Sequence, residues 1–120
     1  MKKFMKSVAL AIWGIKYAIR SERHMKVHMI AAMLACTLAV IAKLSAIEWL
    51  ILIIMISLVI GAELINTAIE HAVDLASPDK HPHAKIAKDV AAGAVLFFAF
   101  AAIIAGIILF GPFLWSLVNE

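Results

Sequence analysis

Residues Ala62–Leu75 read AELINTAIEHAVDL and place polar side chains directly after a long apolar run, Trp49–Ile60. On a helix of about 100° per residue, four of these polar side chains fall within a stripe about 80° wide. The four are Glu63, Asn66, Glu70 and Asp74. Ionisable groups at membrane depth are costly, so they usually face a protein interior and mark function. We therefore predict a buried functional site on this acidic stripe.

A second interpretation is that the helix leaves the membrane here and exposes its carboxylates to water. This interpretation suits Asp74 and can extend to Glu70. It does not suit Glu63 and Asn66, because continuous apolar sequence precedes them.

The composition indicates a membrane protein. Of the 120 residues, 65% are hydrophobic, and the mean hydropathy is +1.02. A soluble domain of this size could not bury so much apolar surface. We expect residues 1–120 to form one all-α integral membrane domain. The single cysteine, Cys36, cannot form an internal disulfide.

The first 28 residues predict a basic amphipathic helix in the membrane interface. Apolar side chains recur at spacings of three and four, and the charged side chains between them are mostly lysine and arginine. Such a helix lies with its apolar face toward the acyl chains. Trp13 and Tyr17 suit the depth of the interface.

Three transmembrane helices are expected to follow, at 29–45, 47–75 and 84–118. The charge-free core of the first, residues 29–42, is short for a span of about 20 residues, and it becomes long enough if Val27 and His28 begin it. Pro78 and Pro82 predict a cytoplasmic loop at 76–83, because proline breaks helices. Pro112 is expected to kink or end the last helix.

The basic residues predict the orientation of the chain. Ten of the eleven Lys and Arg residues lie in the N-terminal helix or near the 76–83 loop, and Lys43 lies alone. Because cytoplasmic segments carry the excess of positive charge, both regions should be cytoplasmic. The acidic stripe then lies at the cytoplasmic end of the second span.

The residue types around the stripe fit phosphoryl transfer to a lipid. Carboxylate oxygens suit Mg²⁺, which binds through one or two carboxylates together with phosphates. Glu22 and the lysines near the 76–83 loop can join the stripe, and lysine binds phosphate as a point charge. A buried glutamate such as Glu63 can act as general base. No Walker motif is present, so the metal would neutralise much of the charge.

Other functions share some of these features. Carboxylates also line the pathways of proton-coupled transporters and channels. A transporter should show inverted repeats, and the segments here differ in length and character. The histidines His71, His81 and His83 could indicate a transition-metal site, although His81 and His83 fit a solvated loop better. His24 and His28 are expected at the level of the lipid headgroups.

Three motifs together resemble the prokaryotic diacylglycerol kinase family. They are AELINTAIEHAVDL, the loop SPDKHPHAKIAKDVAAGAVL and the upstream SERHMKVH. The resemblance extends from Trp13 to about Leu109. The sequences of the motifs are closer to the undecaprenol kinase branch than to the enterobacterial diacylglycerol kinase type. It implies an ATP-dependent lipid kinase acting on undecaprenol, with diacylglycerol as the alternative substrate. It also implies a homotrimer in the bacterial cytoplasmic membrane, with Mg²⁺ as cofactor and active sites shared between chains at the cytoplasmic face.

The resemblance also implies roles for individual residues. Glu63 would be the general base on the lipid hydroxyl, and Glu22 and Glu70 would bind the metal. The ATP site would comprise Glu22, Asn66, Glu70, Asp74, Asp79, Lys80, His81, Lys88 and Asp89. This sequence departs from the enterobacterial type at His28, where that type has an acid, and the departure bears on lipid specificity.

Overall fold

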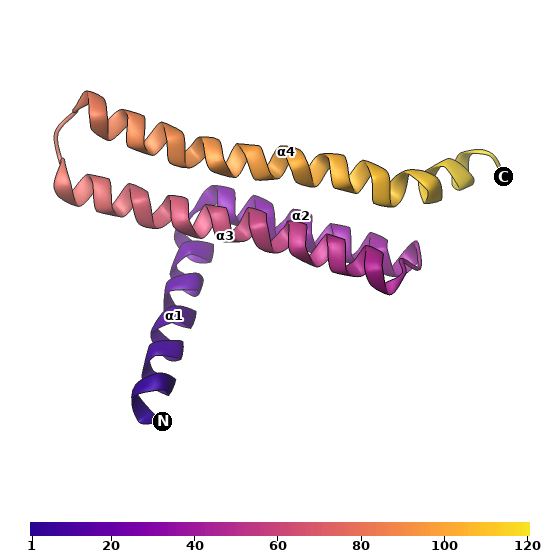
Figure 1. Ribbon diagram of the computed structural model, residues 1–120, viewed down its shortest axis with the longest axis horizontal. Coiled ribbons are helices and arrows are strands. Elements are labelled where there is room, and N and C mark those ends of the chain that lie inside the picture. Colours follow the sequence, from indigo (N-terminus) through magenta and orange to yellow (C-terminus); the bar gives the residue numbers. More distant parts are fainter.

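The computed structural model describes residues 1–120 as four helices. They are α1 (Lys2–Ser21), α2 (Arg23–Ile41), α3 (Ala46–Ala76) and α4 (Pro82–Val118). The last three are each long and apolar enough to cross a membrane. Figure 1 shows these three running alongside one another, while α1 projects away from them. The predicted all-helical membrane architecture with three spans is thus confirmed.

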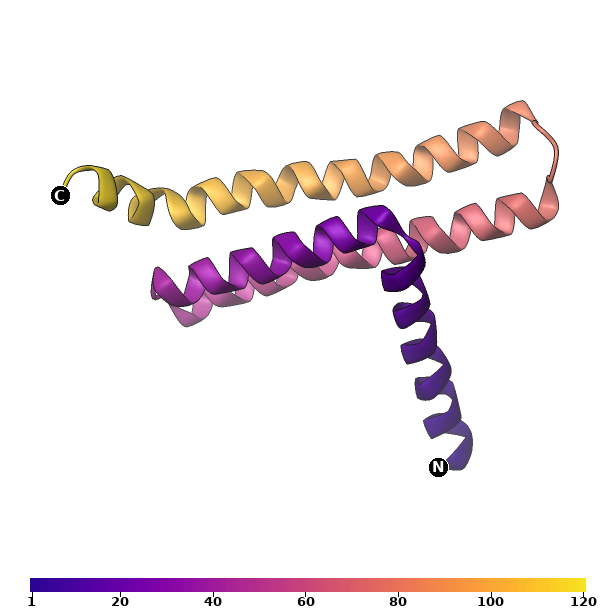
Figure 2. The ribbon, with the colours of Figure 1, turned by 180° about the vertical axis from the view of Figure 1, so that it is seen from behind.

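The first helix ends earlier than predicted. The expected helix over 1–28 is broken at Glu22, whose backbone is extended with φ −98° and ψ 120°. The chain turns sharply there, and the view from behind shows the same turn (Figure 2). The break adds Arg23–His28 to α2, which becomes 19 residues long. A span needs about 20 residues, so this earlier start supplies the length that 29–42 lacked.

A tight turn joins α2 to α3. Lys43 adopts a left-handed backbone with φ 54°, and Ser45 then caps α3. The backbone N–H of Ser45 donates to Glu48 Oε2 at 2.7 Å, and the N–H of Glu48 donates to Ser45 Oγ at 3.3 Å. This reciprocal capping satisfies two N–H groups at the helix start. The turn reverses the chain, so that α2 and α3 run antiparallel.

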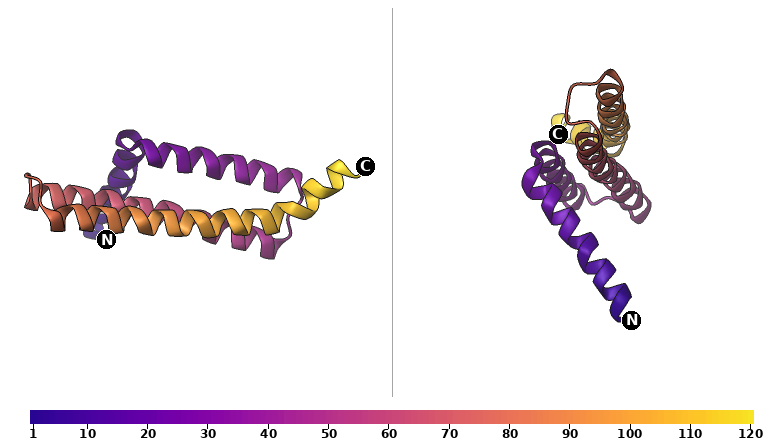
Figure 3. Two further views of the ribbon diagram at one scale, coloured as in Figure 1. Left: turned by 90° about the horizontal axis from the view of Figure 1, so that it is seen from above. Right: turned by 90° about the vertical axis from the view of Figure 1, so that its left-hand side faces the viewer.

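The connection between α3 and α4 is shorter than the predicted loop by a residue or two at each end. Pro82 occupies the first turn of α4, where a missing N–H leaves no hydrogen bond unmade. His81 caps this helix by accepting from the backbone N–H of His83 at 3.1 Å. Further along, α4 passes through Pro112 to Val118. Figure 3 shows the yellow end of α4 turning aside, as a proline inside a helix explains.

Little of the chain is buried within a single molecule. A small apolar cluster lies near the α2–α3 turn and contains Ala39, Leu52, Leu109 and Phe110. Three polar residues are also buried, namely Glu63, Asn66 and Thr67. Many large apolar side chains on all four helices are exposed, including Ile53, Phe97 and Ile103. In a membrane protein, lipid or other chains cover such surfaces.

The orientation can be tested by labelling single cysteines in a Cys36→Ala background. Ser45 caps one end of the hairpin, and Lys80 lies in the connection at the opposite end of α3. We expect Ser45→Cys to react with an impermeant thiol reagent added to intact cells. Lys80→Cys should react only after the membrane is opened, because the excess of positive charge at that end predicts that it faces the cytoplasm. Equal labelling of both from outside would contradict the orientation.

Candidate active site

The acidic stripe on α3 becomes more exposed along the helix. Glu63 and Asn66 are buried, with 3% and 6% of their surface exposed. Glu70 is half-buried and Asp74 is exposed. This gradient agrees with the expectation that only the later carboxylates reach water. A single helix face therefore presents a buried carboxylate at one end and solvated carboxylates at the other.

Glu63 has its partner on the neighbouring helix α2. The Nε2 atom of His28 lies 3.5 Å from Glu63 Oε2, and the two side chains are 20% and 4% exposed. The hydroxyl of Thr67, which is also buried, donates to the backbone carbonyl of Glu63 at 3.0 Å. The expectation that His28 lies at the level of the lipid headgroups did not include this contact. An antiparallel hairpin turning at residues 42–45 brings His28 within about one helical turn of the level of Glu63. Whether the two side chains face each other depends on how the helices rotate against one another, which the sequence does not give.

Asn66 lies between Glu63 and Glu70 on the stripe and bonds to the second of them. Its Nδ2 donates to Glu70 Oε1 at 3.3 Å. Its Oδ1 is buried and has no hydrogen-bond partner. Because an unpaired buried acceptor costs about 1–3 kcal/mol, this oxygen is suited to a donor or cation from a bound molecule. The Asn66 and Glu70 oxygens fit the preference of Mg²⁺ for hard oxygen ligands.

Charged residues of α4 meet the solvated end of the stripe. Lys88 Nζ forms an ion pair with Asp74 Oδ1, and this pair links α3 to α4. Asp89 instead pairs with Lys85 on its own helix. The structure thus places Lys88 beside the stripe, as predicted. The side chain of Asp89 points along α4 to Lys85 and not to the stripe.

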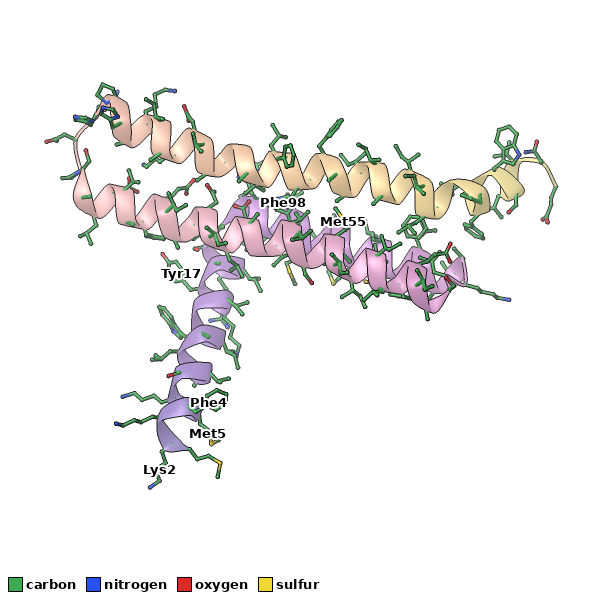
Figure 4. All side chains as sticks on the ribbon, in the orientation of Figure 1. Lys2, Phe4, Met5, Tyr17, Met55 and Phe98 are labelled. Atoms are coloured by element: carbon green, nitrogen blue, oxygen red, sulfur yellow. The ribbon has the colours of Figure 1, made fainter.

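The α1 helix meets the bundle at its C-terminal end. The Tyr17 hydroxyl lies 3.4 Å from Nε2 of His71 on α3, and the Tyr17 ring stacks on Trp13. Figure 4 shows Tyr17 near the end of α1 that approaches α3, with Lys2, Phe4 and Met5 at the distant end. His71 therefore helps to position α1 beside the stripe.

The remaining predicted residues do not touch the stripe within one chain. Glu22 is half-buried at the break between α1 and α2. Asp79 and Lys80 are exposed in the connection before α4, and the ring of His81 stacks on His83. No group of three or more His, Cys, Asp or Glu side chains is assembled to hold a metal ion. A single chain therefore presents the pieces of the predicted metal site without closing it.

An apolar groove runs between α2, α3 and α4. Its volume is about 320 Å³, and its lining is almost entirely hydrophobic. Ala32, Val59 and Ala102 contribute from the three helices, and His28 is the ionisable side chain in the lining. The groove therefore extends through the apolar depth of the bundle to the residue that contacts Glu63.

Comparison with known proteins identifies the family of this chain. The family model for prokaryotic diacylglycerol kinase matches residues 9–110. The chain belongs to the prokaryotic diacylglycerol kinase family. The resemblance noted in the sequence is thus confirmed, and the protein is a lipid kinase. This result favours the enzyme over the transporter and channel alternatives.

Individual relatives of the kinase carry two different names. The undecaprenol kinase of Bacillus subtilis (strain 168) is 43% identical over 112 residues, covering 93% of this chain and 91% of the relative. A diacylglycerol kinase of Synechocystis is 42% identical over 106 residues, covering 88% and 61%. The diacylglycerol kinase of Escherichia coli (strain K12) is 31% identical over 114 residues, covering 95% and 90%.

The link between Asp74 and Lys88 is expected to matter little for stability. Both side chains are substantially exposed, and exposed ion pairs contribute about 0–1 kcal/mol. Asp74→Asn should therefore change the free energy of unfolding in detergent micelles by less than about 1 kcal/mol. Lys85→Gln, which breaks the exposed pair within α4, is the matched control. A much larger loss for Asp74→Asn would show that the pair holds α3 and α4 together.

Proposed function

We propose that this kinase transfers the γ-phosphoryl group of Mg-ATP to undecaprenol and forms undecaprenyl phosphate. The observation that carries the proposal is a buried glutamate, Glu63, beside the residue where the apolar groove reaches the acidic stripe. The groove suits a hydrocarbon chain, and the stripe suits a metal-bound polyphosphate. The name of the 43% identical relative supports undecaprenol. The names of two other relatives support diacylglycerol, with phosphatidic acid as product, as the alternative.

The burial gradient supports a division of roles along α3. Glu63 and Glu70 are seven residues apart, or about 10 Å along the helix axis, so one metal ion is not expected to bind both directly. Glu63 takes the proton of the lipid hydroxyl, and the oxygen of that hydroxyl attacks the γ-phosphorus. The bond from that phosphorus to the bridging oxygen breaks, and ADP leaves. Glu70 and Glu22 would hold Mg²⁺, which would supply neutralisation of the charge on the phosphates.

The nucleotide site is proposed to lie at the solvated end of the stripe. Its members are Asn66, Asp74, Lys88 and Asp89, with Glu22 and Glu70 acting through the metal. Lys88 already lies against Asp74, and the unpaired Oδ1 of Asn66 faces no partner within the chain. The connection before α4 contributes Asp79, Lys80 and His81. This assignment supports ATP as the phosphoryl donor.

A homotrimer with shared sites is proposed as the working assembly. Glu22 makes no contact with Glu70 in one chain, and no metal-binding group is complete there. The many exposed apolar side chains offer surface for neighbouring helices. A Glu22 carboxylate from an adjacent chain would complete the metal site beside Glu70.

We further propose that α1 lies in the interface of the bacterial cytoplasmic membrane. Its lysines and arginines suit anionic headgroups, and its apolar side chains are exposed. The active site then opens at the cytoplasmic face, where the basic residues gather. At that face the kinase meets both ATP and lipid.

The substrate is tested by presenting purified kinase with labelled ATP, Mg²⁺ and single lipid alcohols in bilayers. We expect undecaprenol to give the higher kcat/KM and diacylglycerol a lower one. Both lipids should be supplied at matched surface concentration, and a Glu63→Gln sample measures background. Preference for diacylglycerol would select the alternative substrate. Phosphorylation of neither lipid would reject the proposed reaction.

The division of roles along α3 is tested by two isosteric variants. Glu63→Gln removes the base, which typically contributes about 10²- to 10⁴-fold, so kcat should fall by that order with nucleotide affinity almost intact. Glu70→Gln should weaken Mg-nucleotide binding and shift the Mg²⁺ dependence. Turnover and nucleotide affinity are to be measured for both. Normal turnover in Glu63→Gln would remove the base assignment, and an equal loss of affinity in both would place Glu63 at the metal.

A further inference from the structure

We infer that His28 is a positioning residue that holds the Glu63 carboxylate toward the lipid hydroxyl. The inference rests on the proposed function, since it gives the proposed base its orientation. It assigns a role in the reaction to a residue of α2, a helix that otherwise contributes apolar side chains to the groove.

The first support is the way Glu63 is partnered. Its side chain is 4% exposed, and His28 Nε2 lies 3.5 Å from its Oε2. No other side chain forms an ion pair or hydrogen bond with this carboxylate, and the nearby Thr67 hydroxyl donates to the backbone carbonyl instead. A buried carboxylate without a partner is costly, so the imidazole sets the direction of the group. A base oriented by a further residue is the arrangement by which enzymes aim proton acceptors.

The second support is that the two carboxylate oxygens differ. Oε2 is the oxygen in close contact with His28, whereas Oε1 takes part in no ion pair within the chain. Oε1 is therefore the oxygen free to accept a proton from a substrate hydroxyl. With His28 fixing one oxygen, the other is kept available.

The third support is the place of His28 in the groove. Its side chain lines the groove together with apolar residues of three helices, and it is the ionisable member of that lining. His28 thus contacts the groove on one side and Glu63 on another. A hydroxyl at the end of a chain lying in this groove would arrive beside the pair.

The test separates hydrogen bonding from packing by substituting His28 in two ways. His28→Leu fills the space without a donor, and His28→Gln keeps an amide N–H near the position of Nε2. Because misplacing a reacting group by about 1 Å costs about 100-fold, His28→Leu should lower kcat about 10- to 100-fold with the KM for ATP unchanged. His28→Gln should recover most of that loss. The same two changes at His24, an exposed histidine one turn earlier on α2, should leave kcat unchanged.

Two outcomes would overturn the inference. One is a wild-type kcat in His28→Leu. The other is an equal loss in His28→Leu and His28→Gln, which would assign the effect to packing.

A second measurement tests the pairing without relying on turnover. In kinase labelled with ¹⁵N-histidine, the His28 signal should shift when Glu63 is replaced by Gln, and the His24 signal should stay in place. An unmoved His28 signal would overturn the inference whatever the activity. If the wild type phosphorylates no lipid alcohol, the proposed function fails, and a shifted His28 signal would still support the pairing itself.

Discussion

A carboxylate within an apolar helix bundle must have a partner, and the arrangement of this kinase follows from that constraint. Glu63 lies in α3 directly after a long apolar run, and only 4% of its side chain is exposed. Its partner, His28, comes from α2. The capped turn at Ser45 folds α2 back along α3 and makes this contact available. The early start of α2 at Arg23 keeps His28 inside the helix, where its side chain can reach α3.

The other polar residues of the site become more exposed along α3 with distance from that pair. Asn66 connects to Glu70, and Asp74 connects to Lys88 of α4. Polar groups therefore change from buried and singly partnered to exposed and ion-paired within about three helical turns. Such a gradient matches a reaction between a lipid that stays in the membrane and a nucleotide that stays in water. One helix face can then serve both substrates because its two ends differ in solvation.

Under the proposed function, a single chain would contain only part of this site. The unpaired Oδ1 of Asn66 and the isolated Glu22 both lack partners that a bound molecule or a neighbouring chain could supply. The exposed apolar side chains on α3 and α4 likewise offer surfaces on which lipid or neighbouring chains could pack. Small and apolar helix surfaces associate in lipid by close packing rather than by the hydrophobic effect. Assembly and catalysis are therefore expected to depend on the same surfaces.

Sequence alone determined the helical class, the three spans and the acidic stripe, because hydropathy and the helical period are local properties of the chain. The burial of Glu63 and Asn66 also followed from the apolar residues before them. The break at Glu22 was missed, since neither proline nor glycine marks it. The pairing of His28 with Glu63 and the apolar groove were decided only by tertiary structure. Each depends on how far one helix slides and rotates against another, and that register is set by packing and by the turns between helices.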